Sequence, residues 1–367
     1  MALSIDERVD LIKEVAEELI NEKELREMLI AKEKSGDDIW AYDGFEPSGR
    51  IHIAQGLLRA INVNKLIKAG IKFRFLVADW HAAANNKFGG NIRTIKKVGK
   101  YFVEVWKACG MDLSNVEFMW ASDLVKKPKY WETVLKISIK TTLNRTMRCT
   151  QIMGRKSTDN LLTSQILYPM MQCADIFFMN IDVCQLGMDQ RKVNMLSREV
   201  AKHLNKPKPV AVHHHMVAGL TQPPPDSELN AIDKAIERKM SKSNPNSAIF
   251  MLDTKEEIEK KIKKAWCPNG VVEGNPVLEY TKYLIFEKVN EFVIQRPEKY
   301  GGNLSYSNHE DLEEDYKSGK LSPMDLKPNV ARMLNEFLIP IREYFERNED
   351  AKKLFDFVMK AQKEQTK

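Results

Sequence analysis

Apolar and polar positions alternate with two different periods along the first two thirds of the chain. Residues 5–33 carry apolar side chains at helical spacing among charged ones, which predicts an amphipathic helical segment at the start. A short apolar run over 39–42 predicts a strand, and a glycine-containing turn over 44–50 leads into a predicted helix over 51–69. A second strand is predicted over 73–78. Strand, turn, helix and strand in this order are typical of a βαβ unit, so the pattern predicts a parallel sheet.

The same alternation continues to about residue 217 and then changes. It predicts further strands over 116–121, 181–186 and 209–217, helices over 91–109, 129–152 and 188–204, and another ordered segment over 168–178. A proline-rich break follows at 222–226, where a helix cannot continue because proline lacks the backbone N–H. Beyond residue 254 the pattern is mainly helical, over 255–265, 277–293, 309–318 and 329–363. We therefore predict two domains, an α/β domain with a parallel sheet over residues 1–252 and a mainly α-helical domain over 253–367.

Composition and charge exclude several classes of protein. Glycine and proline account for only 17 and 15 of the 367 residues, which excludes a collagen-like or low-complexity chain. No stretch of about 18 apolar residues lacks a charge, so no membrane-spanning segment is predicted. The first residues are acidic where a secretory signal would be basic and then apolar, which predicts a cytoplasmic protein. The net charge of +6 permits a polyanionic partner without requiring one.

Cysteine and histidine form no pattern typical of a metal site. The five cysteines are scattered and never spaced as C-x-x-C, which predicts a reducing compartment and no structural zinc. In a strand, His213 and His215 would face one side while His214 faces the other, but no carboxylate or cysteine at a suitable spacing completes a ligand set. We therefore predict no protein-bound metal.

The turn over 47–56 lies where the first predicted strand feeds a helix, and open α/β sheets bind ligands at that edge. A helix that starts there would offer unpaired backbone N–H groups to a phosphate, and His52 could donate a hydrogen bond to a phosphoryl group. Gly44 and Gly49 would let the backbone approach a ligand closely. An ordinary turn with an exposed histidine would have the same local pattern. No Walker A sequence, G-x-x-x-x-G-K-[ST], occurs in the chain.

A second signal follows the proline-rich break, in the sequence Lys239-Met240-Ser241-Lys242-Ser243. Two lysines and two serines on a mobile loop can neutralise the charge that develops on a leaving pyrophosphate. Alone, such a segment is usually a solvated basic loop. The turn and the lysine loop together are much more specific than either one.

These two segments resemble a known family of enzymes. His52-Ile53-Ala54-Gln55 and residues 239–243 resemble the HIGH and KMSKS signatures of class I aminoacyl-tRNA synthetases. Residues 42–49, 168–175 and 187–192 are similar to segments of the archaeal and eukaryotic cytosolic tyrosyl-tRNA synthetases, and the resemblance covers about residues 38–345. The sequence differs from HIGH at Ala54 and Gln55. Binding of the nucleotide and its phosphates would therefore depend more on His52 and the lysine loop.

The resemblance implies a Rossmann-like catalytic domain, an anticodon-binding helical domain, and an enzyme that joins tyrosine to tRNA(Tyr). The tyrosine carboxylate would attack the α-phosphate of ATP and release pyrophosphate, leaving tyrosyl-adenylate. The tyrosyl group would then pass to the terminal adenosine of the tRNA. ATP would bring Mg²⁺, held mainly by its phosphates. The family's enzymes are homodimers, and the pairing region is expected within residues 120–195.

A pocket for tyrosine is also predicted from the spacing of three side chains. Tyr168, Gln172 and Asp175 are four and three residues apart, so a helix would place them on one face. A phenol needs one group that accepts its O–H and one that donates to its oxygen, and Asp175 and Tyr42 supply this pair. A polar helix stripe buried against a neighbour is the alternative for this face alone. His81 either lines the same pocket or is a structural histidine.

The resemblance also assigns roles to individual residues. Catalysis would fall to His52, Lys239 and Lys242. Tyrosine would be bound by Tyr42, Gly44, His81, Tyr168, Gln172, Asp175 and Gln190. ATP would be bound by Gly49, His52, Gln55, Gly56, Asp189, Lys239, Met240, Ser241, Lys242 and Ser243. The tRNA would be contacted near its acceptor end by Arg148 and Arg191, and at its anticodon by Tyr300, which would stack on a base, and by Asp325, which would accept from a guanine edge.

Three other functions share part of this pattern. A tryptophanyl-tRNA synthetase would have the same fold, although the pair of Tyr42 and Asp175 is wrong for an indole. A catalytically silent synthetase-like protein would bind RNA, and decayed signatures would favour it. A small-molecule nucleotidyltransferase of similar fold would not need residues 253–367.

Overall fold

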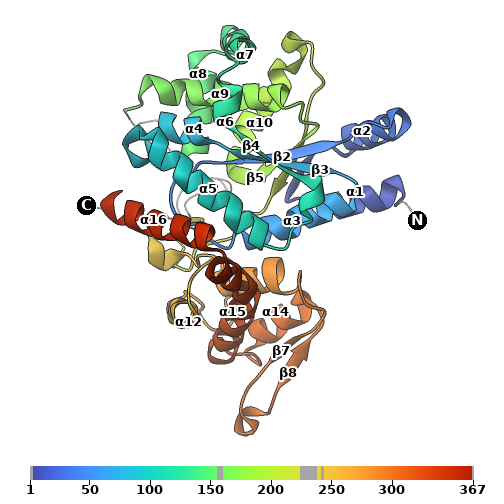
Figure 1. The fold of residues 1–367 in the computed structure, drawn as a ribbon. Helices are drawn as coiled ribbons and strands as arrows, with labels where there is room; N and C mark the ends of the chain where they lie inside the picture. The colour runs from blue at the N-terminus through green and yellow to red at the C-terminus, as the bar shows by residue number, and fades with distance from the viewer. Residues whose placement is uncertain (1–2, 155–159, 224–237, 241–243, 366–367) are drawn as a thin grey trace.

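The structure, a computed structural model, describes residues 3–154, 160–223, 238–240 and 244–365. A six-stranded sheet forms its centre, with the strands in the order β1, β6, β5, β2, β3 and β4 (Figure 1). These strands are β1 (Glu18–Ile20), β2 (Trp40–Phe45), β3 (Lys72–Val77), β4 (Val116–Trp120), β5 (Val183–Gly187) and β6 (Val210–His214). β1 runs antiparallel to β6, and the other neighbouring strands run parallel. The predicted α/β class is confirmed.

Helices cover both faces of this sheet. One face packs against α3 (Leu57–Lys68) and α5 (Ile92–Ala108), and the other against α9 (Thr163–Phe178) and α10 (Arg191–Val200). Because successive strand residues point to opposite faces, Ala41 and Phe73 lie in the first buried cluster while Tyr42 and Leu76 lie in the second. Every residue of β5 and β6 is buried, as expected for parallel strands that are covered on both sides.

Further helices complete the described part of the chain before residue 253. They are α1 (Ile5–Glu14), α2 (Glu22–Ser35), α4 (Asp79–Ala84), α6 (Ala121–Leu124), α7 (Pro128–Ile139) and α8 (Leu143–Cys149), with the 3₁₀ helices η1 (Lys87–Gly90), η2 (Leu113–Asn115), η3 (Thr150–Met153), η4 (Met188–Gln190), η5 (Ala201–Leu204) and η6 (Pro245–Ser247). Local sequence sets several of their ends. Ser4 and Glu7 form a reciprocal cap at the start of α1. α5 ends just before Gly110, whose φ of 77° glycine adopts readily.

The predicted helix over 5–33 is wrong in its middle. α1 and α2 are separated by β1, which pairs with β6 in the register Glu18 to His213. Asn21 then caps α2 by accepting a hydrogen bond from the backbone N–H of Glu24. The pairing partner of β1 lies 195 positions away, and local periodicity cannot detect a contact at that separation.

The predicted helix over 51–69 starts later than expected, at Leu57. Residues 51–53 instead run beside residues 249–251. The Ile53 N–H donates to the Ile249 carbonyl at 2.9 Å, and the Met251 N–H donates to the Ile51 carbonyl at 2.9 Å. His52 therefore lies in a paired turn and not in the first turn of a helix, so the predicted phosphate site at a helix N-terminus does not include it.

The chain after residue 253 is mainly helical, as predicted, and also contains a small antiparallel sheet. Its helices are α12 (Lys255–Lys264), α13 (Pro276–Tyr280), α14 (His309–Ser318), α15 (Pro323–Arg347) and α16 (Glu349–Gln365), with a π-helical turn η7 (Thr281–Ile285) and a 3₁₀ helix η8 (Glu298–Tyr300). The strands are β7 (Phe292–Ile294) and β8 (Leu304–Tyr306). The predicted helix over 277–293 is wrong beyond η7, and the predicted helix over 329–363 is two helices that meet at Asn348. Ser322 caps α15 and proline is tolerated at its first position, so α15 starts earlier than expected.

The two parts of the chain pack closely on each other. α16 lies along α5, where the ring centres of Tyr101 and Phe355 are 6.0 Å apart (Figure 1). One cluster of buried apolar residues includes Val98 of α5 together with Phe345 of α15 and Val358 of α16. The predicted domain boundary at 252 and 253 stays a prediction, because apolar packing continues across it. Within the described ranges, no helix is both long enough and apolar enough to cross a membrane.

Candidate active site

A cavity of about 910 Å³ lies at the carboxyl ends of β2, β3, β5 and β6, which is the edge where parallel sheets bind ligands. It is lined by many of the predicted site residues: Tyr42, Gly44, His52, Gln55, His81, Tyr168, Gln172, Asp175, Asp189, Gln190, Lys239 and Met240. The predicted residues Ser241, Lys242 and Ser243 lie outside the described residues. The structure therefore brings together side chains from segments that are far apart in the sequence.

One end of the cavity is buried and polar, and Asp175 on α9 is its centre. Its Oδ1 accepts a hydrogen bond from Tyr130 Oη at 2.8 Å, and its Oδ2 lies 2.9 Å from Nε2 of His81. The hydroxyl of Tyr42, buried on β2, has no hydrogen-bond partner among the described residues. A ligand hydroxyl at this end would find a carboxylate to accept its proton and a phenol to donate to its oxygen.

Burial controls the protonation of the phenols at this end. It raises the pKa of Tyr42 well above the ordinary value of 10.0, and the neighbouring Cys184 and Asp175 add to this effect. Burial and Asp175 raise the pKa of Tyr130 in the same way. Burial opposes a charge on His81, but the Asp175 carboxylate raises the pKa of this ring above its ordinary value. Both phenols therefore keep their protons at neutral pH and can donate hydrogen bonds.

Sequence reasoning missed Tyr130. It lies on α7, inside the predicted helix over 129–152, and no motif or spacing marks it. Its hydrogen bond to Asp175 joins residues 45 positions apart. Only the packing of α7 against α9 reveals the contact.

The next part of the cavity is lined by amide side chains. Gln172 Nε2 donates to Gln190 Oε1 at 3.1 Å, and Gln190 Nε2 donates to the carbonyl of Ile152 at 3.2 Å. The ring of Tyr168 packs edge to face against His81, with 5.0 Å between the ring centres. These contacts give Tyr168, Gln172 and Gln190 defined positions beside the buried end.

A carboxylate, Glu46, lines the cavity beside these amides. Asn85 Nδ2 donates to Glu46 Oε1 at 3.0 Å, and Lys87 Nζ lies 3.6 Å from Oε2. Burial and Glu46 raise the pKa of Tyr168 well above its ordinary value. Glu46 was not predicted as a site residue. Its place directly after β2 is the signal that could have found it, because residues that follow parallel strands lie at the ligand-binding edge.

The opposite end of the cavity is lined by paired charges. Lys239 Nζ lies 2.9 Å from Asp189 Oδ2, and this carboxylate raises the pKa of Lys239. The buried Arg59 places its Nε 3.3 Å from Asp43 Oδ2 and its Nη1 3.0 Å from Nδ1 of His214. Burial raises the pKa of Asp43 to about 7, although Arg59 lowers it. A charged ligand that binds at this end could therefore break these ion pairs and form new ones with the same side chains.

A comparison with known proteins decides the family. The family model of class I tRNA synthetases (W and Y) matches residues 34–339, which is most of the chain. The chain belongs to this family. Tyrosine–tRNA ligase 1, cytoplasmic, of Arabidopsis thaliana is similar to this synthetase, with 48% identity over 357 residues that cover 96% of this chain and 88% of the relative.

Solved structures of synthetases have the same fold. The tyrosyl-tRNA synthetase of Pyrococcus horikoshii, complexed with L-tyrosine, has a TM-score of 0.89 and 39% identity over 96% of this chain and 100% of that one. The tryptophanyl-tRNA synthetase of Aeropyrum pernix K1 has a TM-score of 0.67 and 20% identity over 93% of this chain and 84% of that one, so the likeness is in fold alone. The predicted resemblance to tyrosyl-tRNA synthetases is confirmed.

Two glycines of the synthetase that were predicted to bind ATP, Gly49 and Gly56, do not line the cavity. Gly49 has a φ of +132°, and a Cβ there would lie 2.5 Å from Nε2 of Gln362. A Cβ on Gly56 would lie 2.5 Å from the sulfur of Met251. Close packing explains both glycines, and their contact with ATP stays a prediction.

The predicted acceptor-end residues lie outside the cavity lining. Arg148 is exposed at the end of α8. Arg191 Nε donates to Glu18 Oε2 on β1 at 2.8 Å. Arg191 of the synthetase therefore already has a carboxylate partner, and its contact with tRNA stays a prediction.

The predicted anticodon residues lie near the β7–β8 hairpin, which is remote from the central sheet (Figure 1). Tyr300 is 61% exposed in the connection between the two strands. Asp325 accepts a hydrogen bond from Ser322 Oγ at 2.9 Å, at the start of α15. Arg296 links the loop that contains Tyr300 to the segment that precedes α15. Its guanidinium donates to the carbonyl of Gly302 in the loop at 2.5 Å and to the carbonyl of Lys320 before α15 at 3.4 Å.

The three consecutive histidines each have partners of their own. His213 Nδ1 lies 2.9 Å from Glu18, and His214 Nδ1 lies 3.0 Å from Arg59. His215 lies between two carboxylates, Glu17 at 3.0 Å and Glu279 at 3.2 Å. In the part of the chain that the structure describes, no group of three or more His, Cys, Asp or Glu side chains is placed to hold a metal ion.

Proposed function

We propose that this synthetase is a tyrosine–tRNA ligase. It activates tyrosine with ATP to give tyrosyl-adenylate and pyrophosphate, and it then transfers the tyrosyl group to the terminal adenosine of tRNA(Tyr). The observation that carries the proposal is the buried end of the cavity, where Tyr42 and Asp175 offer a donor and a carboxylate to a ligand hydroxyl. Similarity to tyrosine–tRNA ligases over almost the whole chain supports it.

The buried end distinguishes tyrosine from related amino acids. A substrate phenol donates to Asp175 and accepts from Tyr42, so both groups are satisfied. Phenylalanine leaves the buried hydroxyl of Tyr42 without a partner and forms no hydrogen bond with Asp175, and an unsatisfied buried group costs about 1–3 kcal/mol. An indole N–H donates but cannot accept, so tryptophan leaves the hydroxyl of Tyr42 unpaired.

The amino group of the substrate is held at the next part of the cavity. An ammonium has three N–H donors and no acceptor. The hydroxyl of Tyr168 and the side-chain carbonyls of Gln172 and Gln190 accept from it, and Glu46 stabilises its positive charge. Gly44 lines the same cavity without a side chain, which leaves room for the substrate.

The activation step needs no protein nucleophile, because the tyrosine carboxylate itself attacks the α-phosphate. The protein contributes position and charge neutralisation. When ATP binds, Lys239 leaves its ion pair with Asp189 and pairs with the phosphates. The Asp189 carboxylate then accepts hydrogen bonds from the ribose hydroxyls. His52 donates to the phosphates. ATP binds as its Mg²⁺ complex, with the ion held mainly by phosphate oxygens.

The rest of the predicted nucleotide site belongs to the same proposal. Lys242 acts with Lys239 on the leaving pyrophosphate. The remaining contacts to ATP come from Gly49, Gln55, Gly56, Met240, Ser241 and Ser243.

ATP–pyrophosphate exchange with each amino acid tests the proposal. We expect exchange that depends on tyrosine and is far weaker with phenylalanine and tryptophan. Exchange with tryptophan alone would overturn the tyrosine assignment. Binding of tRNA without any exchange would instead favour a catalytically silent RNA-binding protein.

We also propose that tRNA(Tyr) is contacted at its anticodon by Tyr300 and Asp325 and near its acceptor end by Arg148 and Arg191. Stacking of one base on an aromatic side chain contributes about 1–3 kcal/mol. Tyr300→Ala should therefore lower tRNA charging roughly tenfold while exchange is unchanged, and Tyr300→Phe, which keeps the ring, should charge normally. An equal loss in both assays would show that Tyr300 has a structural role.

A homodimer and a cytoplasmic location complete the proposal. Trp131, Leu135 and Ile139 are 40%, 61% and 78% exposed on α7 at four-residue spacing, so they form one apolar face. Exposed apolar faces of this kind mark interfaces between proteins. Sedimentation should give a dimer for the wild type and weaker association for Ile139→Lys. The cytoplasmic name of the Arabidopsis relative supports the location.

A further inference from the structure

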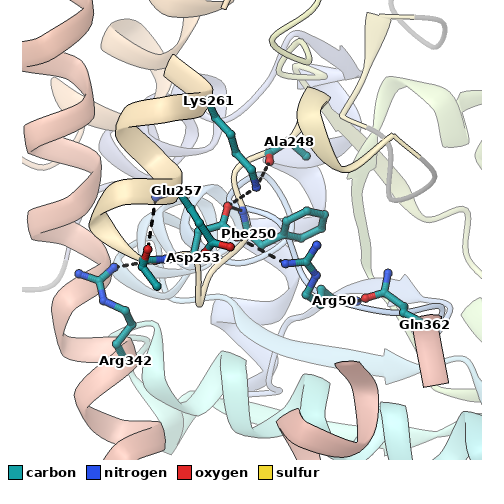
Figure 2. A network of polar contacts seen from close by, with 9 residues as sticks. Arg50, Ala248, Phe250, Asp253, Glu257, Lys261, Arg342 and Gln362 are labelled. Carbon is teal, nitrogen blue, oxygen red and sulfur yellow. Dashed lines mark hydrogen bonds and ion pairs between the residues drawn. The ribbon is translucent and has the colours of Figure 1, made fainter. Parts of the chain in front are cut away.

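The turn that leads to His52 is held by residues from much later in the chain. Figure 2 shows Arg50, two positions before His52, between the side chains of Phe250 and Gln362. Its Nη1 lies 3.5 Å from Oδ1 of Asp253, and its guanidinium lies over the ring of Phe250, 3.8 Å from the centroid. The side chain of Arg50 is therefore fixed by the segment that follows the lysine loop.

Asp253 is itself fixed by the helical part of the chain. It is buried, and its Oδ2 accepts from the Phe250 N–H at 2.8 Å and pairs with Lys261 Nζ of α12 at 2.5 Å (Figure 2). Its carbonyl accepts from Arg342 Nη1 of α15 at 2.9 Å. The partner of Arg50 is thus anchored to two C-terminal helices.

The backbone of the turn is held separately, by α16. The Arg50 N–H donates to Gln362 Oε1 at 3.3 Å. The same side chain covers Gly49, where a Cβ would lie 2.5–3.1 Å from three of its atoms. Met359, Gln362 and Lys363 also line the cavity that contains His52. The last turns of α16 therefore form part of the wall of the cavity that is proposed to bind ATP.

Packing sets the position of α16. Besides the contact between Phe355 and Tyr101, the Nζ of Lys97 on α5 lies 4.7 Å from the ring centroid of Phe357. These contacts hold the helix along α5 and bring its end to the turn at residues 49–50. Gln362 therefore meets the turn on a fixed helix and not on a free terminus.

We propose that Gln362 is a positioning residue for ATP, which holds the Gly49–Arg50 turn so that His52 faces the nucleotide. This inference rests on the proposed tyrosine activation. Gln362 holds the backbone of Arg50, and Asp253 holds its side chain. The helical part of the chain thereby contributes to the first step of the reaction, in which no tRNA takes part.

Exchange assays with varied ATP and varied tyrosine test this role. Gln362→Met keeps the length of the side chain and removes the acceptor. We expect it to raise the KM for ATP roughly fivefold and to leave the KM for tyrosine unchanged. Gln362→Ala also removes the packing over Gly49 and should raise the KM for ATP at least as far. Lys360→Met, at an exposed position of the same helix, is the matched control and should change neither constant.

An unchanged KM for ATP in Gln362→Met would overturn the inference. An equal rise in both KM values would also overturn it, because that result would indicate a general loss of packing. Absence of tyrosine-dependent exchange in the wild type would reject the proposed function and this role together. If the wild type shows tyrosine-dependent exchange and Gln362→Met has the same KM for ATP as the wild type, the positioning role alone is rejected.

Discussion

The two ends of the cavity are built from different kinds of contact. The buried end, which is proposed to hold the side chain of tyrosine and is called the tyrosine end here, contains Asp175 and Tyr130. These two buried side chains are joined by a hydrogen bond that need not break when a substrate hydroxyl binds. At the opposite end, which is proposed to bind ATP and is called the nucleotide end here, Lys239 is paired with Asp189. Because ATP brings its own negative charge, this ion pair must open for both side chains to contact the nucleotide.

Because of this difference, we expect selection of the amino acid and binding of ATP to depend on different residues. A buried hydrogen-bonding pair discriminates because a wrong ligand leaves its groups unsatisfied. Paired charges respond instead to pH, salt and the charge of the ligand. We therefore expect variants at the tyrosine end to change which amino acid is used, and variants at the nucleotide end to change how ATP is used.

The largest effect is expected for Asp175→Ala. Removing the buried acceptor should lower the discrimination between tyrosine and phenylalanine in kcat/KM by about 2–3 kcal/mol, or roughly 30- to 160-fold. The KM for ATP should change little. Exchange with both amino acids measures the ratio, and Asp123→Ala, an exposed carboxylate on α6, is the control. Unchanged selectivity would reject the role of Asp175 and remove the basis of the comparison.

A pH dependence of stability is expected at the nucleotide end. His215 lines this end between Glu17 and Glu279, with its ring stacked on Tyr283. Burial opposes its charge, but the two carboxylates raise its pKa from 6.5 to about 9. The charged ring therefore stabilises the folded state in full below about pH 6.5, and this contribution is lost as the pH rises through about 9.

Urea unfolding at these two pH values measures the contribution of His215. We expect the free energy of unfolding to fall by roughly 2–3 kcal/mol across the window. His215→Gln should lose most of this dependence, whereas His203→Gln, at an exposed position of η5, should keep it. Equal pH dependence in the wild type and His215→Gln would show that this ion-paired cluster does not stabilise the fold.

Local periodicity predicted the elements whose contacts lie within their own βαβ units. The strand predicted over 73–78 is β3 (Lys72–Val77), and the helix predicted over 91–109 is α5 (Ile92–Ala108). β1 was missed because three residues within a charged helical pattern become a strand only through pairing with β6. β7 was missed for a similar reason, since its partner β8 lies beyond a connection of nine residues, 295–303.

The candidate site shows the same limit. Tyr42, Asp175 and Gln190 were predicted from motifs, and they line one cavity. Tyr130 and Gln362 were not predicted, because each reaches the site from a helix that carries no signature. The contact between Gln362 and Arg50 spans 312 positions. Motifs therefore predict groups that face the ligand, while the groups that hold them depend on tertiary packing.

Lys239→Ala tests the nucleotide end directly. Loss of a positive charge that pairs with phosphate should raise the KM for ATP about tenfold, and selectivity between tyrosine and phenylalanine should be unchanged. Exchange at several ATP concentrations measures the effect. Lys239→Arg keeps the charge and should be less affected, and Lys126→Ala, on an exposed surface, is the control. A change in amino-acid selectivity would show that the two ends are not independent.

Tyr130→Phe should have the smallest effect and tests whether the tyrosine end acts as a set of separate contacts. The variant removes the 2.8 Å hydrogen bond to Asp175 Oδ1 and leaves Oδ2 and Tyr42 in place. The loss of one buried hydrogen bond should lower kcat/KM for tyrosine roughly fivefold, which corresponds to about 1 kcal/mol, and the KM for ATP should be unchanged. If the defect instead equals that of Asp175→Ala, the carboxylate needs Tyr130 to hold it in place, and selection at this end depends on the packing of α7 against α9.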